Sequence, residues 1–155
     1  MMEEKEKAWK TVSSKYLFRR PWLTVRCEDM LLPNGNHIPE YYILEYPDWV
    51  NTIAITKDGK FVFVRQYRPG LGRTSYELCA GVCDKEDASP LVSAQRELWE
   101  ETGYGKGNWQ EYMVISANPS THTNLTHCFL ATDVEPIDHQ HLEDTEDLPV
   151  HPLPF

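Results

Sequence analysis

Three glutamates in the second half of the chain, Glu97, Glu100 and Glu101, have side chains and a spacing suited to metal chemistry. On a helix, positions i, i+3 and i+4 share one face, so these carboxylates would crowd together. Each close pair of like charges costs roughly 0.2–0.5 kcal/mol on an exposed helix, and a divalent cation removes that conflict. Oxygen ligands suit hard ions, and Mg²⁺ in particular combines a few carboxylates with water and substrate phosphates. The spacing therefore predicts a site for Mg²⁺, or alternatively Mn²⁺, that meets a phosphate substrate.

The same residues allow a second interpretation, a solvated helix face on which Arg96 and Glu100 form an i,i+4 ion pair. For an arbitrary helix with two adjacent glutamates, the solvated face is the favoured interpretation. The residues that flank the glutamates must decide between the two.

The segment that carries the glutamates, residues 89–102, is the clearest helix in the sequence. Ser89 is a candidate N-cap, Pro90 occupies the first helical position, and Gly103 ends the segment. Apolar residues recur along one side, namely Leu91, Ala94 and Leu98. This side is expected to pack on the rest of the domain and to position the carboxylates.

Strand signals lie on both sides of this helix. Before it, aromatic and β-branched residues predict strands over 16–25, 41–46, 49–56, 61–67 and 75–78. Turn sequences at 33–36 and 57–60 indicate two hairpins. After it, strands are expected over 111–116 and 126–134. Residues 139–155 are acidic and then proline-rich, without the closing helix that a compact α+β domain often has, so a C-terminal truncation is expected.

Composition limits the classes of partner. The 155 residues fit one globular domain, and a net charge of −9 argues against binding a nucleic acid backbone. No run approaches the roughly 18 apolar residues of a membrane span, and the start lacks a signal-peptide core. The four cysteines are scattered and form no CxxC pair, so reduced thiols are expected. The expected location is the cytoplasm, with no membrane or nucleic acid partner.

Residues 81–104 resemble the Nudix box, in which a glycine loop leads to a helix that reads Arg-Glu-apolar-x-Glu-Glu-x-Gly-apolar. The residues in register are Arg96, Glu97, Leu98, Glu100, Glu101, Gly103 and Tyr104. The resemblance implies an α+β fold (an α/β/α sandwich) with a mixed β-sheet on which this helix packs. It divides the single domain into an antiparallel N-terminal extension, residues 1–46, and a core, residues 47–155. It also implies that the three glutamates and the Ala80 carbonyl hold the metal, and that Arg96 orients the carboxylates.

The loop before the helix departs from the family pattern by a one-residue insertion, which puts Ala88 where the box has its first glutamate. We expect Asp87 or Glu86 to take over that role, with activity retained. Cys79 stands where the family tends to have proline, and it is interpreted as a small core residue.

Beyond the box, residues 41–150 resemble the ADP-ribose pyrophosphatase branch of the family. Pro119 lies sixteen positions after Gly103, a placement that accompanies ADP-ribose and related substrates. The segment 64–69 resembles the phosphate-contacting strand of the branch, with Arg68 favoured over Arg65 because a guanidinium binds phosphate in a bidentate manner. Glu77, on the strand before the box, is a further candidate substrate contact.

The acidic segment 143–147 resembles the loop that supplies the catalytic base, and both Glu143 and Glu146 are candidates. Among aromatic residues near strand ends, Trp49 ranks before Trp22 and Tyr46 as a platform for the base of the substrate. Members of this branch are commonly homodimers, which the additional N-terminal strands would permit.

The resemblance thus implies metal-dependent hydrolysis of a nucleoside diphosphate sugar, with ADP-ribose giving AMP and ribose 5-phosphate. Two alternatives stay open. One keeps the fold and changes the substrate to GDP-mannose, another nucleotide sugar or a nucleoside triphosphate. The other is an inactive Nudix-fold module that binds nucleotides.

Overall fold

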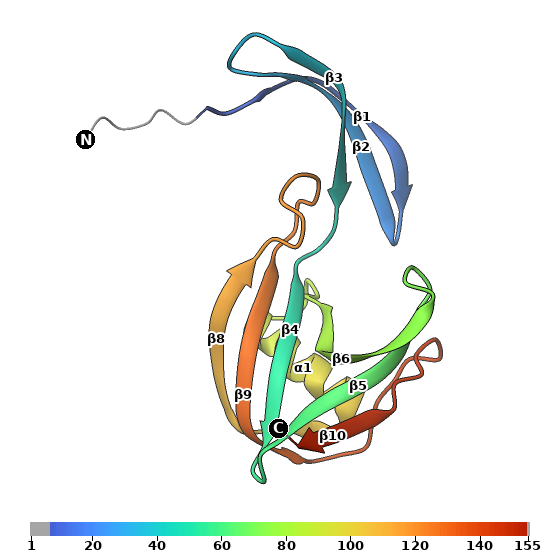
Figure 1. The fold of residues 1–155 in the computed structure, drawn as a ribbon, viewed down its shortest axis with the longest axis vertical. Helices are drawn as coiled ribbons and strands as arrows, with labels where there is room; N and C mark the ends of the chain where they lie inside the picture. The colour runs from blue at the N-terminus through green and yellow to red at the C-terminus, as the bar shows by residue number, and fades with distance from the viewer. Residues whose placement is uncertain (1–6, 155) are drawn as a thin grey trace, which may run out of the picture. The chain divides into compact units, whose positions relative to one another are not determined.

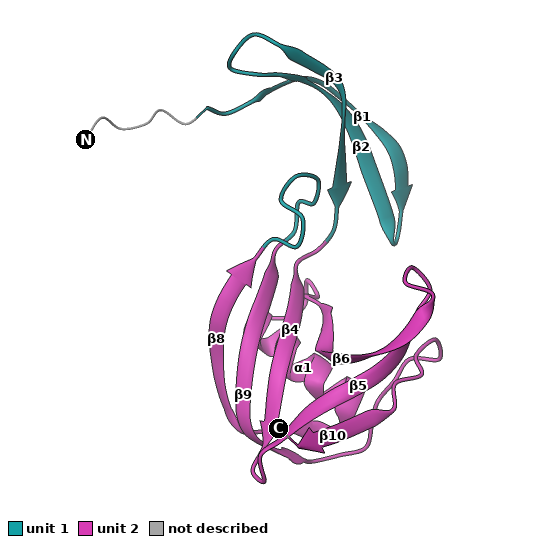
Figure 2. Ribbon diagram, viewed as in Figure 1, with its two compact units in different colours: residues 1–46, 116–124 teal, residues 47–115, 125–155 magenta. Residues whose placement is uncertain are grey.

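The computed structural model describes residues 7–154, which form two compact units (Figure 2). Within the described residues, the first unit comprises 7–46 and 116–124, and the second comprises 47–115 and 125–154. No helix in the described part of the chain is both long enough and apolar enough to cross a membrane.

The first unit contains an antiparallel three-stranded sheet in the order β1-β2-β3 (Figure 1). Its strands are β1 (Lys10–Arg20), β2 (Leu23–Leu31) and β3 (His37–Glu45). The prediction of one strand over 16–25 was wrong, because Pro21 and Trp22 form a turn between β1 and β2. The predicted turn before β3 is confirmed, and Gly35 adopts a positive φ of 87° there.

The 116–124 loop joins this unit through the backbone of β3. The Leu44 N–H donates to the Thr121 carbonyl at 2.8 Å, and the Thr123 N–H donates to the Leu44 carbonyl at 3.1 Å. Several large apolar side chains of the sheet remain exposed, and Trp22 at the β1–β2 turn is 80% exposed. Such a surface is typical of a sheet that meets another apolar surface.

The second unit is built on a mixed, curled sheet in the order β10-β5-β6-β4-β9-β7, with β8 paired to β9 (Figure 1). Strands β4 and β9 run parallel, and the other pairs are antiparallel. The strands are β4 (Trp49–Thr56), β5 (Lys60–Arg68), β6 (Arg73–Val82), β7 (Tyr104–Gly105), β8 (Asn108–Ile115), β9 (Thr126–Pro136) and β10 (Val150–Pro154). The strands expected over 49–56, 61–67, 75–78, 111–116 and 126–134 thus all occur, with boundaries that shift by a few residues.

The helix α1 (Pro90–Thr102) confirms the prediction for residues 89–102. The Ser89 hydroxyl accepts a hydrogen bond from the Val92 N–H at 3.3 Å, an N-cap worth about 1 kcal/mol. At the other end, Gly103 has a φ of 73°, and its N–H donates to the Trp99 carbonyl at 2.8 Å. Because both ends are capped, the position of each glutamate on the helix is well defined.

The core lies between α1 and the sheet. Leu98 of α1 is fully buried in a cluster with five side chains from four strands, which are Ala54, Val62, Cys79, Ala131 and Val134. The burial of Cys79 agrees with its interpretation as a core residue. Residues 7–154 contain one helix, α1. An α/β/α sandwich has two helical layers, and one of them is present in these residues.

The proline-rich end of the chain forms a strand that the sequence did not predict. β10 pairs with β5 in an antiparallel register, in which Pro152 lies opposite Val62. Proline lacks an N–H donor and is tolerated here because β10 is an edge strand. Leu148, just before this strand, is buried at 1% exposure and anchors the end of the acidic segment.

Candidate active site

Glu101 is the most buried of the three helix carboxylates, at 8% exposure. Burial raises its pKa to about 7, and the nearby charge of Glu97 adds to this effect. Hydrogen bonds from the Cys79 thiol and from the Ala80 N–H, the latter at 3.2 Å, oppose the rise. Within the described residues, no lysine or arginine forms an ion pair with Glu101, and the printed pairs of Arg68 and Arg96 are with other acids.

Glu97 lies directly over the backbone of β6. A Cβ atom built on Gly81 would overlap the Glu97 carboxylate, so a side chain at position 81 would displace this group. Burial also raises the pKa of Glu97. Gly81 thus allows a carboxylate of α1 to approach the strand.

Arg96 connects the carboxylates of α1 to the loop that precedes it. Its Nη1 atom donates to Glu97 Oε1 and to Glu100 Oε2, both at 2.9 Å. Its Nη2 atom donates to the Val82 carbonyl at 3.0 Å, and Asp84 lies 3.4 Å away. This geometry is the one expected of a residue that orients carboxylates.

Asp87 completes the shell around Arg96. Its Oδ2 atom accepts from Arg96 Nε at 3.1 Å and from Nη2 at 3.0 Å. Of the two acids that the sequence offered in place of the first box glutamate, Asp87 makes this contact and Glu86 is exposed. The loop insertion was the signal in the sequence that pointed to these two acids.

Arg68 of β5 and Glu77 of β6 form an ion pair between the two strands, although the register partner of Glu77 is Val64. Arg68 Nε lies 3.0 Å from both carboxylate oxygens of Glu77, and Nη2 donates to Oε2 at 2.6 Å. Both residues lie on the sheet face that packs on α1, because they alternate in phase with the buried Val64 and Cys79. The charge of Glu101 helps to raise the pKa of Arg68, after the larger effect of Glu77 and against desolvation, which places Arg68 within electrostatic reach of the helix carboxylates.

Arg65 lies on the opposite face of β5 from Arg68. Its guanidinium lies 5.9 Å from the ring of Tyr76, to which it is paired in register. The structure therefore separates the two arginines that the sequence grouped in one segment.

The acidic segment is folded back on itself. The Glu143 N–H donates to Glu146 Oε2 at 2.9 Å, and the Glu146 N–H donates to the Glu143 carbonyl at 2.9 Å. The charge of Glu146 contributes to the raised pKa of Glu101, after the larger effects of burial and Glu97. Of the two candidate bases, Glu146 is thus the one whose charge reaches the helix.

Gln140 fixes the start of this segment, a role that the sequence did not indicate. Its Nε2 atom donates to the Glu101 carbonyl at 2.6 Å and to the Leu148 carbonyl at 2.7 Å. The segment from 141 to 147 is therefore tied at both ends to the terminus of α1.

The two remaining predicted site residues are Trp49 and Pro119. Trp49 is paired in register with Val82 on one side and Thr126 on the other, at the start of β4. Pro119 lies in the 116–124 loop, which belongs to the first unit.

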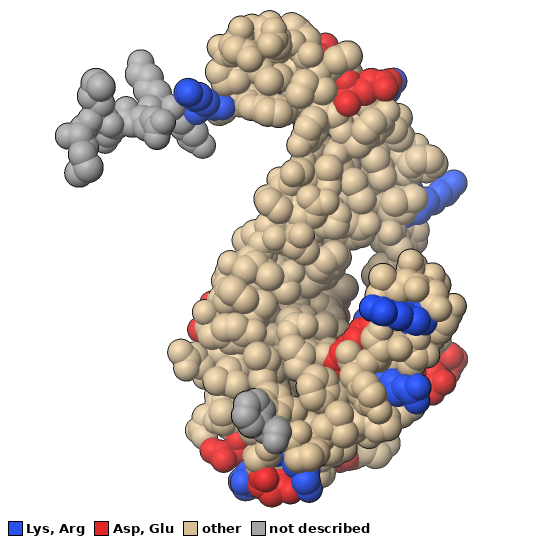
Figure 3. All heavy atoms as spheres, viewed as in Figure 1, with Lys and Arg blue, Asp and Glu red and all other residues tan. Residues whose placement is uncertain are grey.

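The donor set fits a hard divalent cation. Two of the three carboxylates of α1 lie against the β6 backbone, Glu97 at Gly81 and Glu101 at the Ala80 N–H. The guanidinium of Arg96 bonds Glu97 and Glu100. Oxygen donors of this kind are the ligands of ions such as Mg²⁺ and Mn²⁺. On the face drawn in Figure 3, acidic and basic side chains lie in small separate groups, and no extended basic surface is visible on that face.

Comparison with protein families assigns both parts of the chain. Residues 46–153 match the NUDIX domain, and residues 9–44 match the nucleoside diphosphate sugar hydrolase N-terminal domain. The chain therefore belongs to the Nudix hydrolase family, whose members in general depend on a divalent metal ion.

Three curated relatives illustrate the range of the family. ADP-ribose pyrophosphatase of Bacillus subtilis (strain 168) is 30% identical over 138 residues, which cover 89% of this chain and 74% of that protein. Methanol dehydrogenase activator of Bacillus methanolicus is 33% identical over 122 residues, 79% of this chain and 65% of that protein. GDP-mannose pyrophosphatase of Escherichia coli (strain K12) is 33% identical over 111 residues, 64% of this chain and 56% of that protein. The chain spans less than two thirds of the latter two proteins.

A solved structure described as ADP compounds hydrolase shares the fold. It aligns with a TM-score of 0.81 over 94% of this chain and 78% of its own, at 23% sequence identity. The expected Nudix fold is thereby confirmed.

Proposed function

We propose that the chain is a metal-dependent pyrophosphohydrolase of nucleoside diphosphate sugars, with Mg²⁺ as the ion and ADP-ribose as the substrate. The observation that carries this proposal is the arrangement of three glutamates on α1 in a chain of the Nudix family, in which Arg96 bonds Glu97 and Glu100 and the β6 backbone bonds Glu101. The relative named ADP-ribose pyrophosphatase supports the choice of substrate. The products would be AMP and ribose 5-phosphate.

The residues that would hold the ion are Glu97, Glu100 and Glu101, together with the carbonyl of Ala80. When bound, a divalent ion of this kind lowers the pKa of water and neutralises charge on phosphoryl oxygens. Arg96 keeps the carboxylates in place through its bonds to Glu97 and Glu100 and its anchor on Asp87. Arg96 is therefore a positioning residue.

Arg68 is the proposed clamp on the pyrophosphate. Its guanidinium already makes a planar, bidentate contact with the carboxylate of Glu77, and a phosphate offers the same pair of oxygens. Before substrate binds, Glu77 holds the guanidinium of Arg68 in position. When the pyrophosphate binds, Arg68 contacts it in place of Glu77 or together with Glu77. Arg65 is the second candidate for a phosphate contact.

Glu146 is the proposed general base, in preference to Glu143. Its charge reaches Glu101, and the turn that it forms with Glu143 is held by one backbone hydrogen bond and by one from the Glu143 N–H to the Glu146 carboxylate. A carboxylate at this position would take the proton from the attacking water. Trp49 is the proposed platform for the base of the nucleotide, and Pro119 the proposed contact that selects nucleotide sugars.

The assembly that we propose is a homodimer in the cytoplasm. The exposed apolar side chains of the sheet β1-β2-β3, among them Phe18 and Trp22, support burial against a second copy. The cysteines are all free thiols, which supports a reducing compartment.

The relative named GDP-mannose pyrophosphatase favours GDP-mannose as the second candidate substrate. A panel of ADP-ribose, GDP-mannose, NADH and nucleoside triphosphates, with Mg²⁺ and with release of monophosphate as the readout, distinguishes the two. We expect turnover of ADP-ribose to exceed that of the others, and Glu101→Gln to abolish it. The matched control is Glu86→Gln, which removes an exposed carboxylate of the neighbouring loop.

Absence of turnover for every compound, by a folded protein in Mg²⁺, would contradict the hydrolase assignment. Saturable binding of a nucleotide without product would then identify a binding module. Faster turnover of GDP-mannose would keep the reaction and change the substrate.

A further inference from the structure

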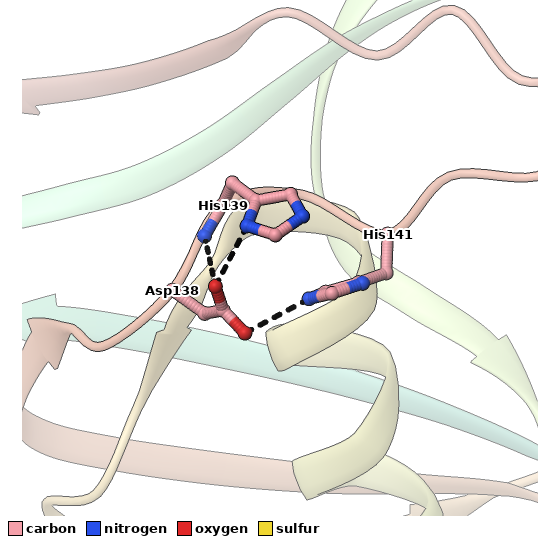
Figure 4. Close-up of side chains that lie close together, drawn as sticks. All are labelled: Asp138, His139 and His141. Carbon is pink, nitrogen blue, oxygen red and sulfur yellow. Dashed lines mark hydrogen bonds and ion pairs between the residues drawn. The ribbon is translucent and has the colours of Figure 1, made fainter.

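The segment after β9 brings one carboxylate and two imidazoles together beside the end of α1. Asp138, His139 and His141 each present one ligand atom, and these atoms lie within 4.8 Å of one another. Figure 4 shows both rings turned toward the Asp138 carboxylate, His139 Nδ1 at 2.7 Å from Oδ1 and His141 Nε2 at 3.0 Å from Oδ2. None of these residues belongs to the carboxylate cluster of α1.

The backbone of this segment is fixed to the helix terminus. The Asp138 N–H donates to the Gly103 carbonyl at 3.2 Å, and the His141 N–H donates to the Glu100 carbonyl at 2.8 Å. The ring of His141 packs on that of Trp99, with 4.2 Å between the centroids. The His141 ring and the Asp138 carboxylate are therefore held in place before any ligand arrives.

The position also favours positive charge. The carbonyl groups at the C-terminal end of a helix carry a partial negative charge that attracts cations. The last turn of α1 contains no basic residue that would neutralise this charge. A cation beside Asp138 would do so.

We propose that Asp138, His139 and His141 form a binding site for a transition metal ion of the Zn²⁺ type, distinct from the carboxylate site of α1. Two imidazole nitrogens and one carboxylate oxygen suit Zn²⁺, whereas Mg²⁺ prefers oxygen ligands alone. His139 is 79% exposed at its side chain, so the remaining coordination positions are open to water. The site requires no entry path through the protein.

The bound ion acts on the terminus of the helix. It ties the segment 138–141 more firmly to the carbonyls of Glu100 and Glu101, to which His141 and Gln140 are bonded. The expected consequence is a higher thermal stability of the second unit in the presence of Zn²⁺.

The test is a calorimetric titration of the full chain with Zn²⁺, after removal of metals and with excess Mg²⁺ present to occupy the carboxylate site. We expect one Zn²⁺ per chain, and an affinity that falls at least about tenfold in His139→Gln. Because the ring of His139 is exposed, we expect His139→Gln to fold like the wild type. His37→Gln is the matched control, because His37 forms a comparable exposed pair with Asp29, at 3.1 Å, without a third ligand.

A second measurement locates the ion independently of affinity. Co²⁺ quenches the fluorescence of a neighbouring indole, so we expect its addition to quench the wild type more than Trp99→Phe, in which the indole that packs on His141 is absent. Equal Zn²⁺ affinity of wild type and His139→Gln would overturn the proposal. The absence of saturable Zn²⁺ binding would also overturn it. A third contrary result is Zn²⁺ binding that is lost in Glu100→Gln and retained in His139→Gln.

Discussion

Arg96 donates two hydrogen bonds to a single oxygen of Asp87, from Nε at 3.1 Å and from Nη2 at 3.0 Å. The carboxylate comes from the loop before α1, at the place where the chain departs from the Nudix pattern by one residue. The pair thus shows how the insertion is accommodated, because the guanidinium keeps an acidic partner although position 88 is alanine.

Replacement of Asp87 by asparagine removes the charge and keeps the shape. A hydrogen bond to a charged group contributes about 1.5–3 kcal/mol, and the Asp87 side chain is largely buried, so we expect a loss of about 2 kcal/mol in the free energy of unfolding. Urea denaturation with and without Mg²⁺ measures it. Glu86→Gln, an exposed neighbour, should change stability by less than about 0.5 kcal/mol. Equal effects of the two substitutions would show that Asp87 has no special role.

The raised pKa of Glu101 predicts how the metal-free protein responds to pH. The pKa is about 7 in the folded chain and 4.5 in the reference state, so folding favours the protonated form. Stability is therefore lost as pH rises from about 5 to above 7, by roughly 3 kcal/mol at most. Thermal unfolding in a chelator at about pH 5.5 and about pH 8 should reveal the loss in the wild type and a smaller one in Glu101→Gln.

The control for this experiment is Glu135→Gln. The lysines Lys106 and Lys57 lower the pKa of Glu135 to about 2, so this group is ionised at both pH values. Removal of the Glu135 charge should therefore change the thermal stability by the same amount at both pH values. Added Mg²⁺ should stabilise the wild type more at the higher pH, where Glu101 is ionised; a larger effect at the lower pH would contradict the assignment of Glu101 as a ligand.

Gly81→Ala should weaken metal binding without unfolding the chain. The added methyl group would occupy the place of the Glu97 carboxylate, which is flexible and moves away. We expect the affinity for Mn²⁺, measured by electron paramagnetic resonance, to fall about tenfold or more. Gly70→Ala is the matched control because a Cβ atom there meets nothing within 4 Å. Unchanged affinity in Gly81→Ala would separate Glu97 from the metal site.

Substitution of the two arginines of β5 distinguishes their roles. Arg68→Lys keeps the charge and loses the bidentate geometry, so we expect KM for ADP-ribose to rise about tenfold with a smaller change in kcat. Arg65→Lys, on the opposite face of the strand, should change KM less. The reverse order would assign the phosphate contact to Arg65.

Gln140→Glu tests how the acidic segment is held. The substitution replaces an amide that donates to the carbonyls of Glu101 and Leu148 with an acceptor, so both bonds are lost. We expect faster amide hydrogen exchange in residues 141–147, and a lower kcat with little change in KM. Gln95→Glu, at an exposed position of α1, is the control. If exchange in 141–147 is unaffected, Gln140 does not position the segment.

The features that the sequence revealed are those that neighbouring residues determine. The caps Ser89 and Gly103 delimit α1, and the helical period alone places Glu97, Glu100 and Glu101 on one face. The strands of the core followed from their apolar runs. In these cases the local preference and the final structure agree.

The features that the sequence concealed depend on distant partners. Strand β10 contains two prolines, and it forms because β5 presents an edge to it. Gln140 bonds a carbonyl 39 residues away, and neither residue type indicates the pairing. Residues 16–25 read as one strand because aromatic and β-branched residues continue across Pro21, whereas the chain turns there.

The guanidinium of Arg96 gives the carboxylate cluster an internal counterion. It bonds Glu97 and Glu100 from within, so the acidic face of α1 assembles before an external ion is available. Small zinc domains, by contrast, remain unfolded until the metal binds. We therefore expect folding and metal loading to be separate events in this chain, so that a newly made molecule acquires its shape in a metal-poor environment and becomes active when the ion is supplied.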